Sequence, residues 1–256
     1  MYSVRMTCSP DEVDRISGEL WEAGTLGIRE IEEGDRVVLI ATFENVQPGA
    51  WKEDQSIDWI AETQRAWPAR PVGQRIFLAP PWNHESTPEG RFRLVHNPSF
   101  ASGTGEHPCT QLALVALEEC VAPEAKIVDV GTGSGILAIA ARLLGSASAV
   151  GVDPDETALG VARENHALNG LEPQLINSSA DCLMDCSADI VVANINATVL
   201  LSIADELLRI SAPSGRLILT GFTKPELPAI EQNFPSSTKR VYQSGEWVCM
   251  NLGFAA

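Results

Sequence analysis

The strongest constraint on this chain is a glycine turn between an apolar strand and an apolar helix. Residues 126–130 have a strand pattern, glycines alternate at Gly131, Gly133 and Gly135, and residues 136–144 are almost entirely apolar. Glycine lets the backbone turn sharply and approach a ligand, and the first amides of the helix offer hydrogen-bond donors. A tight strand-to-helix turn also needs glycine with no ligand present, so this motif alone leaves both interpretations open.

Strand and helix patterns alternate on both sides of this turn, throughout residues 91–256. Repeated β-α-β units predict an α/β domain in which helices cover both faces of a parallel sheet. We therefore expect a Rossmann-like doubly wound sheet, with a hairpin as its antiparallel edge. The predicted strands are 126–130, 147–152, 174–177, 189–194, 216–220, 240–243 and 246–252, and the predicted helices are 108–120, 136–144, 156–169, 199–210 and 225–233.

The first part of the chain has a different pattern. Residues 1–62 predict a small α+β domain, in which a strand, a helix ending at Gly24 and two further strands follow one another. This β-α-β-β order is typical of part of a ferredoxin-like sandwich. Residues 63–90 contain several prolines, which predict a linker between the two domains.

Composition narrows the classes of partner. The formal net charge is −16, while an RNA backbone or an anionic membrane requires clustered Lys and Arg. We therefore expect no nucleic-acid or membrane binding, and instead a basic protein or a small molecule. The chain starts without a signal-peptide pattern, which predicts a cytoplasmic protein. Its six cysteines are scattered without metal-ligand spacing, so no metal is expected.

Three carboxylates accompany the glycine turn. Asp129 precedes it by two residues, Asp153 ends the next predicted strand, and Asp181 follows the third. An acid at the position of Asp153 can accept hydrogen bonds from both ribose hydroxyls of an adenosine. Asp181 falls where the exocyclic amine of adenine would lie. The trio predicts a nucleoside ligand held by Asp129, Gly131, Thr132, Gly133, Asp153 and Asp181.

Asn194 ends another buried strand, 189–194. Ligands of open parallel sheets bind off the carboxyl ends of the strands, which predicts that Asn194 lies next to the nucleoside. A helix cap or a turn is the alternative role for this asparagine. A nicotinamide-dependent dehydrogenase is disfavoured, because its fingerprint is G-x-G-x-x-G and the glycines here alternate.

With these segments, the sequence resembles class I S-adenosylmethionine-dependent methyltransferases. More narrowly, it resembles the bacterial PrmA family, which methylates ribosomal protein eleven of the large subunit. Residues 100–110, which include a Gly-Thr-Gly-x-His sequence, are similar to the signature of that family. The glycine turn, residues 192–195 and the closing residues 245–248 also match it. The resemblance covers essentially the whole chain.

The resemblance implies methyl transfer from S-adenosylmethionine to lysine or N-terminal amines of that basic ribosomal protein. Thr110, Gly131, Asp153 and Asn194 are implied cofactor contacts, and Asn194 is also implied to face the methyl acceptor as the catalytic residue. The loop with Thr104, Gly105 and His107 is expected to cover the cofactor. Departures from the signature at Ser102 and Cys109 leave open a relative with another protein substrate, or one that binds the cofactor without catalysis.

Overall fold

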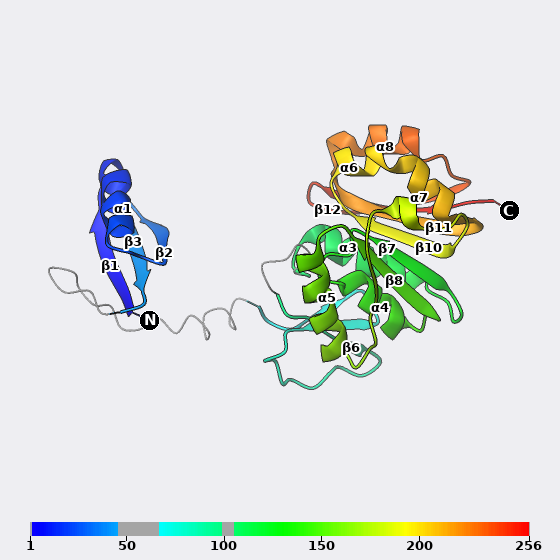
Figure 1. The fold of residues 1–256 in the computed structure, drawn as a ribbon, viewed down its shortest axis with the longest axis horizontal. Helices are drawn as coiled ribbons and strands as arrows, with labels where there is room; N and C mark the ends of the chain where they lie inside the picture. Colours follow the sequence, from blue (N-terminus) through cyan, green and yellow to red (C-terminus); the bar gives the residue numbers. More distant parts are fainter. Residues whose placement is uncertain (1, 46–66, 99–104, 256) are drawn as a thin grey trace. The chain divides into compact units, whose positions relative to one another are not determined.

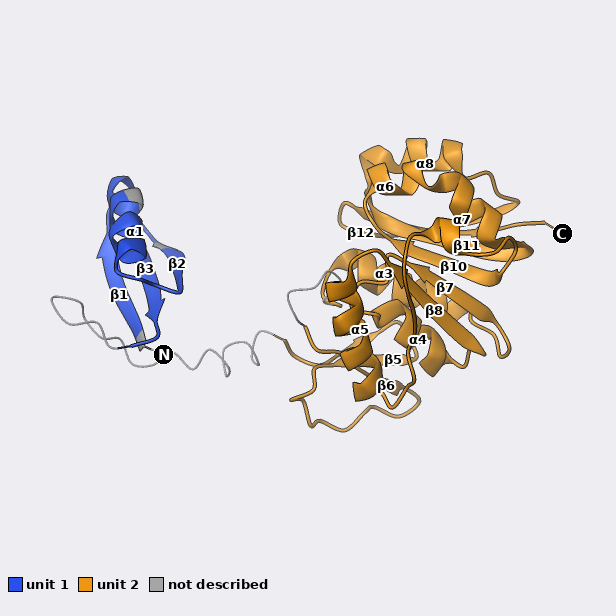
Figure 2. Cartoon of the chain, viewed as in Figure 1, with its two compact units in different colours: residues 1–66 blue, residues 67–256 orange. Residues whose placement is uncertain are grey.

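The computed structural model describes residues 2–45, 67–98 and 105–255. The chain divides into two compact units, residues 1–66 and residues 67–256 (Figure 2). Each unit has its own hydrophobic core and is described by itself.

In the described part of the first unit, residues 2–45, a three-stranded antiparallel sheet packs against one helix. Its strands β1 (Tyr2–Cys8), β2 (Gly27–Glu33) and β3 (Arg36–Phe43) pair in the order β1-β3-β2. Helix α1 (Val13–Glu22) follows the short 3-10 turn η1 (Pro10–Glu12), where the Glu12 carboxylate accepts hydrogen bonds from the amide and hydroxyl of Ser9. The core joins side chains of α1, among them Ile16 and Leu20, to those of β1 and β3. The β-α-β-β order is the one expected from the sequence.

The second unit is built on a seven-stranded sheet with the order β12-β13-β11-β10-β7-β8-β9. Strands β7 to β11 run parallel to one another, whereas β13 is antiparallel to β11 and to β12. This confirms the Rossmann-like fold class. The strands are β7 (Lys126–Val130), β8 (Ser148–Asp153), β9 (Gln174–Asn177), β10 (Ala188–Asn194), β11 (Ser211–Thr223), β12 (Thr238–Ser244) and β13 (Trp247–Gly253).

Helices cover both faces of this sheet (Figure 1). One apolar cluster joins α3 and α4 to the sheet, and a second cluster joins α6, α7 and α8 to its other face. The helices are α3 (Pro108–Cys120), α4 (Ile136–Leu144), α5 (Glu156–Leu168), α6 (Ala197–Ser202), α7 (Ala204–Ile210) and α8 (Leu227–Asn233). The order of the strands reverses between β7 and β10, and ligands of such sheets bind at this kind of switch point.

The predicted linker, residues 63–90, differs from the structure. Residues 67–90 belong to the second unit and contain β4 (Arg70–Val72) and β5 (Ile76–Ala79), which form a three-stranded sheet with β6 (Phe92–Val95). Pro71 is compatible with β4 because this strand lies at the edge of the sheet and pairs only with β5. Side chains of all three strands, including Val72, Ile76 and Leu94, are buried in the core cluster of α3 and α4.

A conservative core substitution tests this division of the chain. Ile76 is fully buried, so Ile76→Val is expected to lower the free energy of unfolding by about 1 kcal/mol through the loss of one packed methyl group. Val241→Ala, on the exposed edge strand β12, removes more atoms and should change stability by less than about 0.5 kcal/mol. Chemical denaturation measures both values. If Ile76→Val unfolded with the same free energy as the wild type, residues 67–90 would not be packed in the core of the second unit.

The predicted helix 199–210 is two helices in the structure. It is divided at Ile203, whose φ of −115° interrupts the helical backbone between α6 and α7. Asp205 and Glu206 lie in the first turn of α7, where acidic side chains interact favourably with the helix dipole. The predicted final helix begins as the 3-10 turn η3 (Lys224–Glu226) before α8. Within the described ranges, no helix is long and apolar enough to cross a membrane.

Candidate functional site

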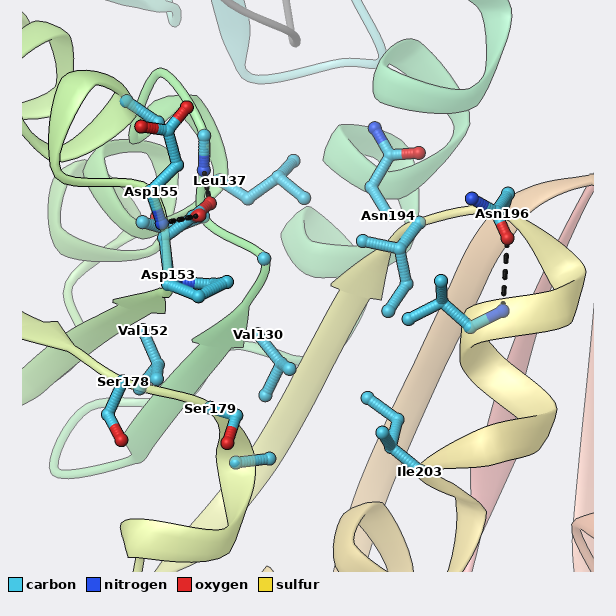
Figure 3. A pocket seen from close by; sticks show the side chains of 18 of the residues that line it. Val130, Leu137, Val152, Asp153, Asp155, Ser178, Ser179, Asn194, Asn196 and Ile203 are labelled. Carbon is cyan, nitrogen blue, oxygen red and sulfur yellow. Dashed lines mark hydrogen bonds between the residues drawn. The ribbon is translucent and has the colours of Figure 1, made fainter.

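A cavity of about 880 Å³ opens at the carboxyl ends of the parallel strands. Figure 3 shows Val130, Asp153 and Asn194 around it. They are the last residues of β7, β8 and β10, respectively. Such a volume is typical of sites for drug-sized small molecules and cofactors. The lining residues are Val130, Gly131, Thr132, Gly133, Ile136, Leu137, Val152, Asp153, Pro154, Asp155, Thr157, Ala158, Val161, Ser178, Ser179, Ala180, Asn194, Ile195, Asn196, Val199 and Ile203.

The glycine turn forms one wall of the cavity, and hydrogen bonds to the buried Asp129 stabilise it. Gly131 and Gly133 have φ values of 69° and 52°, in the left-handed region that favours glycine. The carboxylate of Asp129 accepts hydrogen bonds from the Thr132 hydroxyl at 2.7 Å and from the Ala138 amide at 3.2 Å. Asp129 is buried and does not line the cavity. In the structure it therefore supports the turn, whereas the sequence suggested a contact with the ligand.

Burial raises the pKa of Asp129 to about 6, and the nearby Asp153 carboxylate adds to the shift, while hydrogen bonds from Thr132 and Ala138 oppose it. The folded protein thus binds this proton more tightly than the unfolded chain. Its stability should fall as the pH rises from about 4 to about 6, by up to about 3 kcal/mol from this group. Denaturation at several pH values, with Asp129→Asn as the reference, measures this contribution. If the free energy of unfolding depended on pH in the same way in both proteins, the raised pKa of Asp129 would be contradicted.

Asp153 joins β8 to the glycine turn. One carboxylate oxygen accepts the Gly133 amide at 2.9 Å, and the other accepts the Asp155 amide at 3.0 Å. Each carboxylate oxygen has a further lone pair, so Asp153 can still accept hydrogen bonds from a ligand in the cavity that it lines. The structure thus brings Asp153 together with Gly131, Thr132 and Gly133, as the sequence predicted.

Asn194 lies across the cavity from Asp153, at the end of β10 (Figure 3). Its side-chain amide nitrogen donates to the Thr110 hydroxyl at 3.1 Å, and Thr110 is buried in the first turn of α3. This bond engages the nitrogen end of the amide and leaves the carbonyl oxygen as an acceptor. Thr110 does not line the cavity, so the structure gives it the role of a support for Asn194.

Two glycines fix the backbone just after Asn194. A Cβ atom at Gly131 would lie 2.6 Å from the side chain of Ile195, and one at Gly221 would overlap the Ile195 backbone. Gly221 also has a φ of 96°, which few other residues adopt. Sequence reasoning missed Gly221, and its only signal was a glycine following a predicted strand. Both positions thus require glycine for the chain to pass between them.

The loop before α3 lies apart from the cavity lining in its described part. Gly105 packs against Leu78, and its φ of 80° requires glycine. His107 is the N-cap of α3, where its Nδ1 accepts the Cys109 amide at 3.3 Å, and its ring contacts Trp247 edge-on at 4.5 Å. Neither Gly105 nor His107 lines the cavity. Thr104 lies outside the described residues.

Asp181, the third predicted carboxylate, does not line the cavity either. It is an exposed residue of the 3-10 turn η2 (Ala180–Cys182), and its carboxylate accepts a hydrogen bond from the Ser179 hydroxyl. Its neighbours Ser178, Ser179 and Ala180 line the cavity instead. Figure 3 shows Ser178 and Ser179 on the side of Val152 and Val130. Sequence reasoning did not single out these small residues, although they directly follow β9, as Gly131 follows β7.

The lining combines a few hydrogen-bonding side chains, among them Asp153, Asn194 and Asn196, with many apolar ones. Asp153 suits the hydroxyls of a nucleoside, and the glycine turn allows the ligand to approach the backbone closely. Ile195, which follows Asn194, and Val199, whose amide donates to the Asn196 side chain, provide an apolar wall near Asn194. The cavity can thus hold a nucleoside at the carboxyl ends of β7 and β8, with a reactive group extending toward Asn194.

Comparisons with known proteins agree with this arrangement. A family model described as ribosomal protein L11 methyltransferase (PrmA) matches residues 30–254. A ribosomal protein L11 methyltransferase of Symbiobacterium thermophilum is 35% identical over 223 residues, which cover 85% of this chain and 72% of that protein. The enzyme of Thermus thermophilus is 33% identical over 99% of this chain and 100% of its own length.

A solved structure is also similar. The crystal structure of a ribosomal protein L11 methylase from Lactobacillus delbrueckii subsp. bulgaricus aligns with a TM-score of 0.66 and 29% sequence identity. The alignment covers 74% of this chain and 99% of that one.

Proposed function

The chain belongs to the PrmA family of ribosomal protein L11 methyltransferases, and we propose that its cavity is where S-adenosylmethionine is bound and the methyl group is transferred. Membership makes it an S-adenosylmethionine-dependent protein methyltransferase, with ribosomal protein L11 as its substrate. The observation that carries the assignment of the site is the cavity itself, with Asp153 and the glycine turn at one side and Asn194 at the other.

The residues present fit this cofactor. The carboxylate of Asp153 is an acceptor for the ribose hydroxyls, and the glycines at positions 131 and 133, which line the cavity without side chains, let the rest of the nucleoside approach the backbone closely. The wall of Ser178, Ser179 and Ala180 belongs to the base, because it follows β9, the strand farthest from Asn194 in this half of the sheet. When bound, S-adenosylmethionine would supply a methyl group bonded to a positively charged sulfur. A nucleophile that attacks the methyl carbon displaces this sulfur, which leaves as a neutral thioether.

Asn194 positions the acceptor amine. Its amide nitrogen is engaged by Thr110, so its carbonyl oxygen is the group that accepts a hydrogen bond from an N–H of the amine. This contact holds the nitrogen lone pair toward the methyl group, and correct alignment is the main requirement of such a displacement. Asn194 is accordingly the catalytic residue of the proposal.

The apolar wall near Asn194 helps to supply the reactive form of the amine. A lysine amine has a pKa of about 10.4 in water and is then charged at neutral pH, so it must lose a proton before it can attack. Burial against Ile195 and Val199 disfavours the ammonium form and lowers the pKa of the substrate amine. The site thus needs no metal to generate the nucleophile.

Charge and compartment are consistent with the substrate. A net charge of −16 favours encounter with a basic protein over binding to the phosphates of RNA. All six cysteines are free thiols, in keeping with the reducing cytoplasm as the site of action. The first unit, a separate small domain, is the part that we assign to substrate recognition.

Large ribosomal subunits from cells that lack L11 methylation provide the test. The purified protein is incubated with them and with labelled S-adenosylmethionine, and the subunit proteins are then separated. Label in L11 is expected. Cofactor binding without label in any ribosomal protein would instead indicate a relative that no longer catalyses the reaction. Label in a different ribosomal protein would show that L11 is not the substrate.

A further inference from the structure

A single arginine, outside the cavity, holds the loop that forms the base end of the cavity. Arg209 lies in the last turn of α7, and its guanidinium donates to the backbone carbonyls of Leu183 at 2.7 Å, Ala180 at 3.3 Å and Asp181 at 3.4 Å. It also forms an ion pair with Asp185 at 2.6 Å. Four acceptors of one loop thus depend on one side chain.

The same residue holds the far end of this loop through its backbone. The Arg209 carbonyl accepts the amide of Cys186 at 2.9 Å, and Cys186 has a φ of 51°, a left-handed conformation that is unfavourable for residues other than glycine. The loop is therefore attached to α7 at its start by a side chain and at its end by the main chain.

This loop needs such support because it has little regular structure. It connects β9 to β10, and apart from the short turn η2 it contains no helix or strand. Its first residues, Ser178, Ser179 and Ala180, line the cavity, and the Ala180 carbonyl is one of those that Arg209 holds. A change in the position of Arg209 would thus shift the wall against which the base packs.

We propose that Arg209 is a positioning residue that fixes the base-binding wall of the cofactor cavity, and that it thereby sets both the affinity and the base selectivity of cofactor binding. The proposal rests on the assignment of this cavity to S-adenosylmethionine. Without the guanidinium, the loop samples several positions, and the apparent affinity falls by the fraction of molecules in which the wall is in place. Arg209 itself does not touch the cofactor.

The test measures binding of the demethylated cofactor, S-adenosylhomocysteine, by calorimetry, together with its inosine analogue, in which a carbonyl oxygen replaces the adenine amine. Arg209→Met is expected to weaken S-adenosylhomocysteine binding about tenfold and to reduce the preference of the wild type for adenine over hypoxanthine. Asp185→Asn, which removes only the ion pair, should have a much smaller effect. Because the main-chain bond to Cys186 remains, the variant should still fold.

Arg163→Met is the matched control. Arg163 also forms one ion pair, with Glu156 at 2.9 Å, but its side chain is exposed on α5, and among the described residues no hydrogen bond or ion pair joins it to the loop. The affinity of the Arg163→Met variant for S-adenosylhomocysteine and its base preference should stay within about twofold of those of the wild type. If Arg209→Met is too unstable to titrate, Arg209→Lys replaces it, because an ammonium cannot reproduce the fork of contacts and should still weaken binding severalfold.

The outcomes separate the two proposals. A wild type that does not bind S-adenosylhomocysteine would refute the assignment of the cavity, and with it the role of Arg209. A wild type that binds it, with unchanged affinity and base preference in the folded Arg209 variants, would refute the role of Arg209 alone. A wild type that binds both analogues equally would place the base away from this wall and would also overturn the proposal.

Discussion

Asp153→Ala is expected to weaken binding of S-adenosylmethionine by about a hundredfold. Two causes add to one another. The cavity loses the acceptor for the ribose hydroxyls, and hydrogen bonds to a charged group contribute about 1.5–3 kcal/mol each. The glycine turn also loses the partner of the Gly133 amide, which the carboxylate holds at 2.9 Å. Calorimetric titration of the purified variant measures the affinity directly.

Asp189→Ala is a matched control for this substitution. Its carboxylate likewise accepts a backbone amide, that of Lys126 at 2.9 Å, but Asp189 lies at the amino end of β10, away from the cavity. The control should bind the cofactor with nearly the affinity of the wild type. If Asp153→Ala bound as tightly as Asp189→Ala, Asp153 would only support the turn, and the nucleoside would have to lie elsewhere.

Asn194→Ala is expected to lower kcat for methylation of L11 by about a hundred- to a thousandfold, with cofactor affinity changed by less than about threefold. The reason is that the proposed contact of Asn194 is with the reacting amine, whereas the ribose contact of the cofactor belongs to Asp153. Single-turnover kinetics with bound cofactor, combined with calorimetry, separate the two effects.

Variants of Thr110 test how Asn194 is held. Thr110→Val removes the hydroxyl that the amide nitrogen of Asn194 contacts at 3.1 Å, and should lower kcat about tenfold, while Thr110→Ser keeps the hydroxyl and should retain most of the activity. Loss of cofactor affinity in Asn194→Ala with an unchanged kcat would reverse the assignment and make Asn194 a binding residue.

The central part of the fold could be predicted from the sequence because its signals are local and strong. Strand β7, the glycine turn and helix α4 have the predicted bounds, since an apolar strand, three glycines and an apolar helix allow few other structures. Helix α3 also begins at Pro108, as expected for proline in a first helical turn.

Tertiary packing explains where sequence reasoning differed from the structure. The prolines of residues 63–90 resembled those of a linker, but nothing local indicates that Val72 and Ile76 are buried against α3 and α4. Similarly, an acid beside a nucleoside turn can face the ligand or the backbone. Asp129 lies beneath the turn and Asp181 is exposed on its loop, and both orientations depend on elements that fold around them.

The supporting residues show the same limit. Thr110, Gly221 and Arg209 lie on three different elements and act through Asn194, Ile195 and the loop after β9. No spacing in the sequence connects each of them to the group that it holds. The resemblance singled out Thr110 as a cofactor contact, but its bond to Asn194, like the roles of Gly221 and Arg209, depends on elements that the folded sheet brings together.

The most direct measurement of the central claim is peptide mass mapping of purified L11 after incubation with S-adenosylmethionine and the wild-type protein, in parallel with Asn194→Ala. The proposed function predicts that L11 gains whole methyl masses on lysine or N-terminal nitrogens with the wild type, and gains few or none with the variant in the same time. Methylation of other atoms, an unmodified L11 beside a protein that binds the cofactor, or equal methylation by both proteins would contradict it.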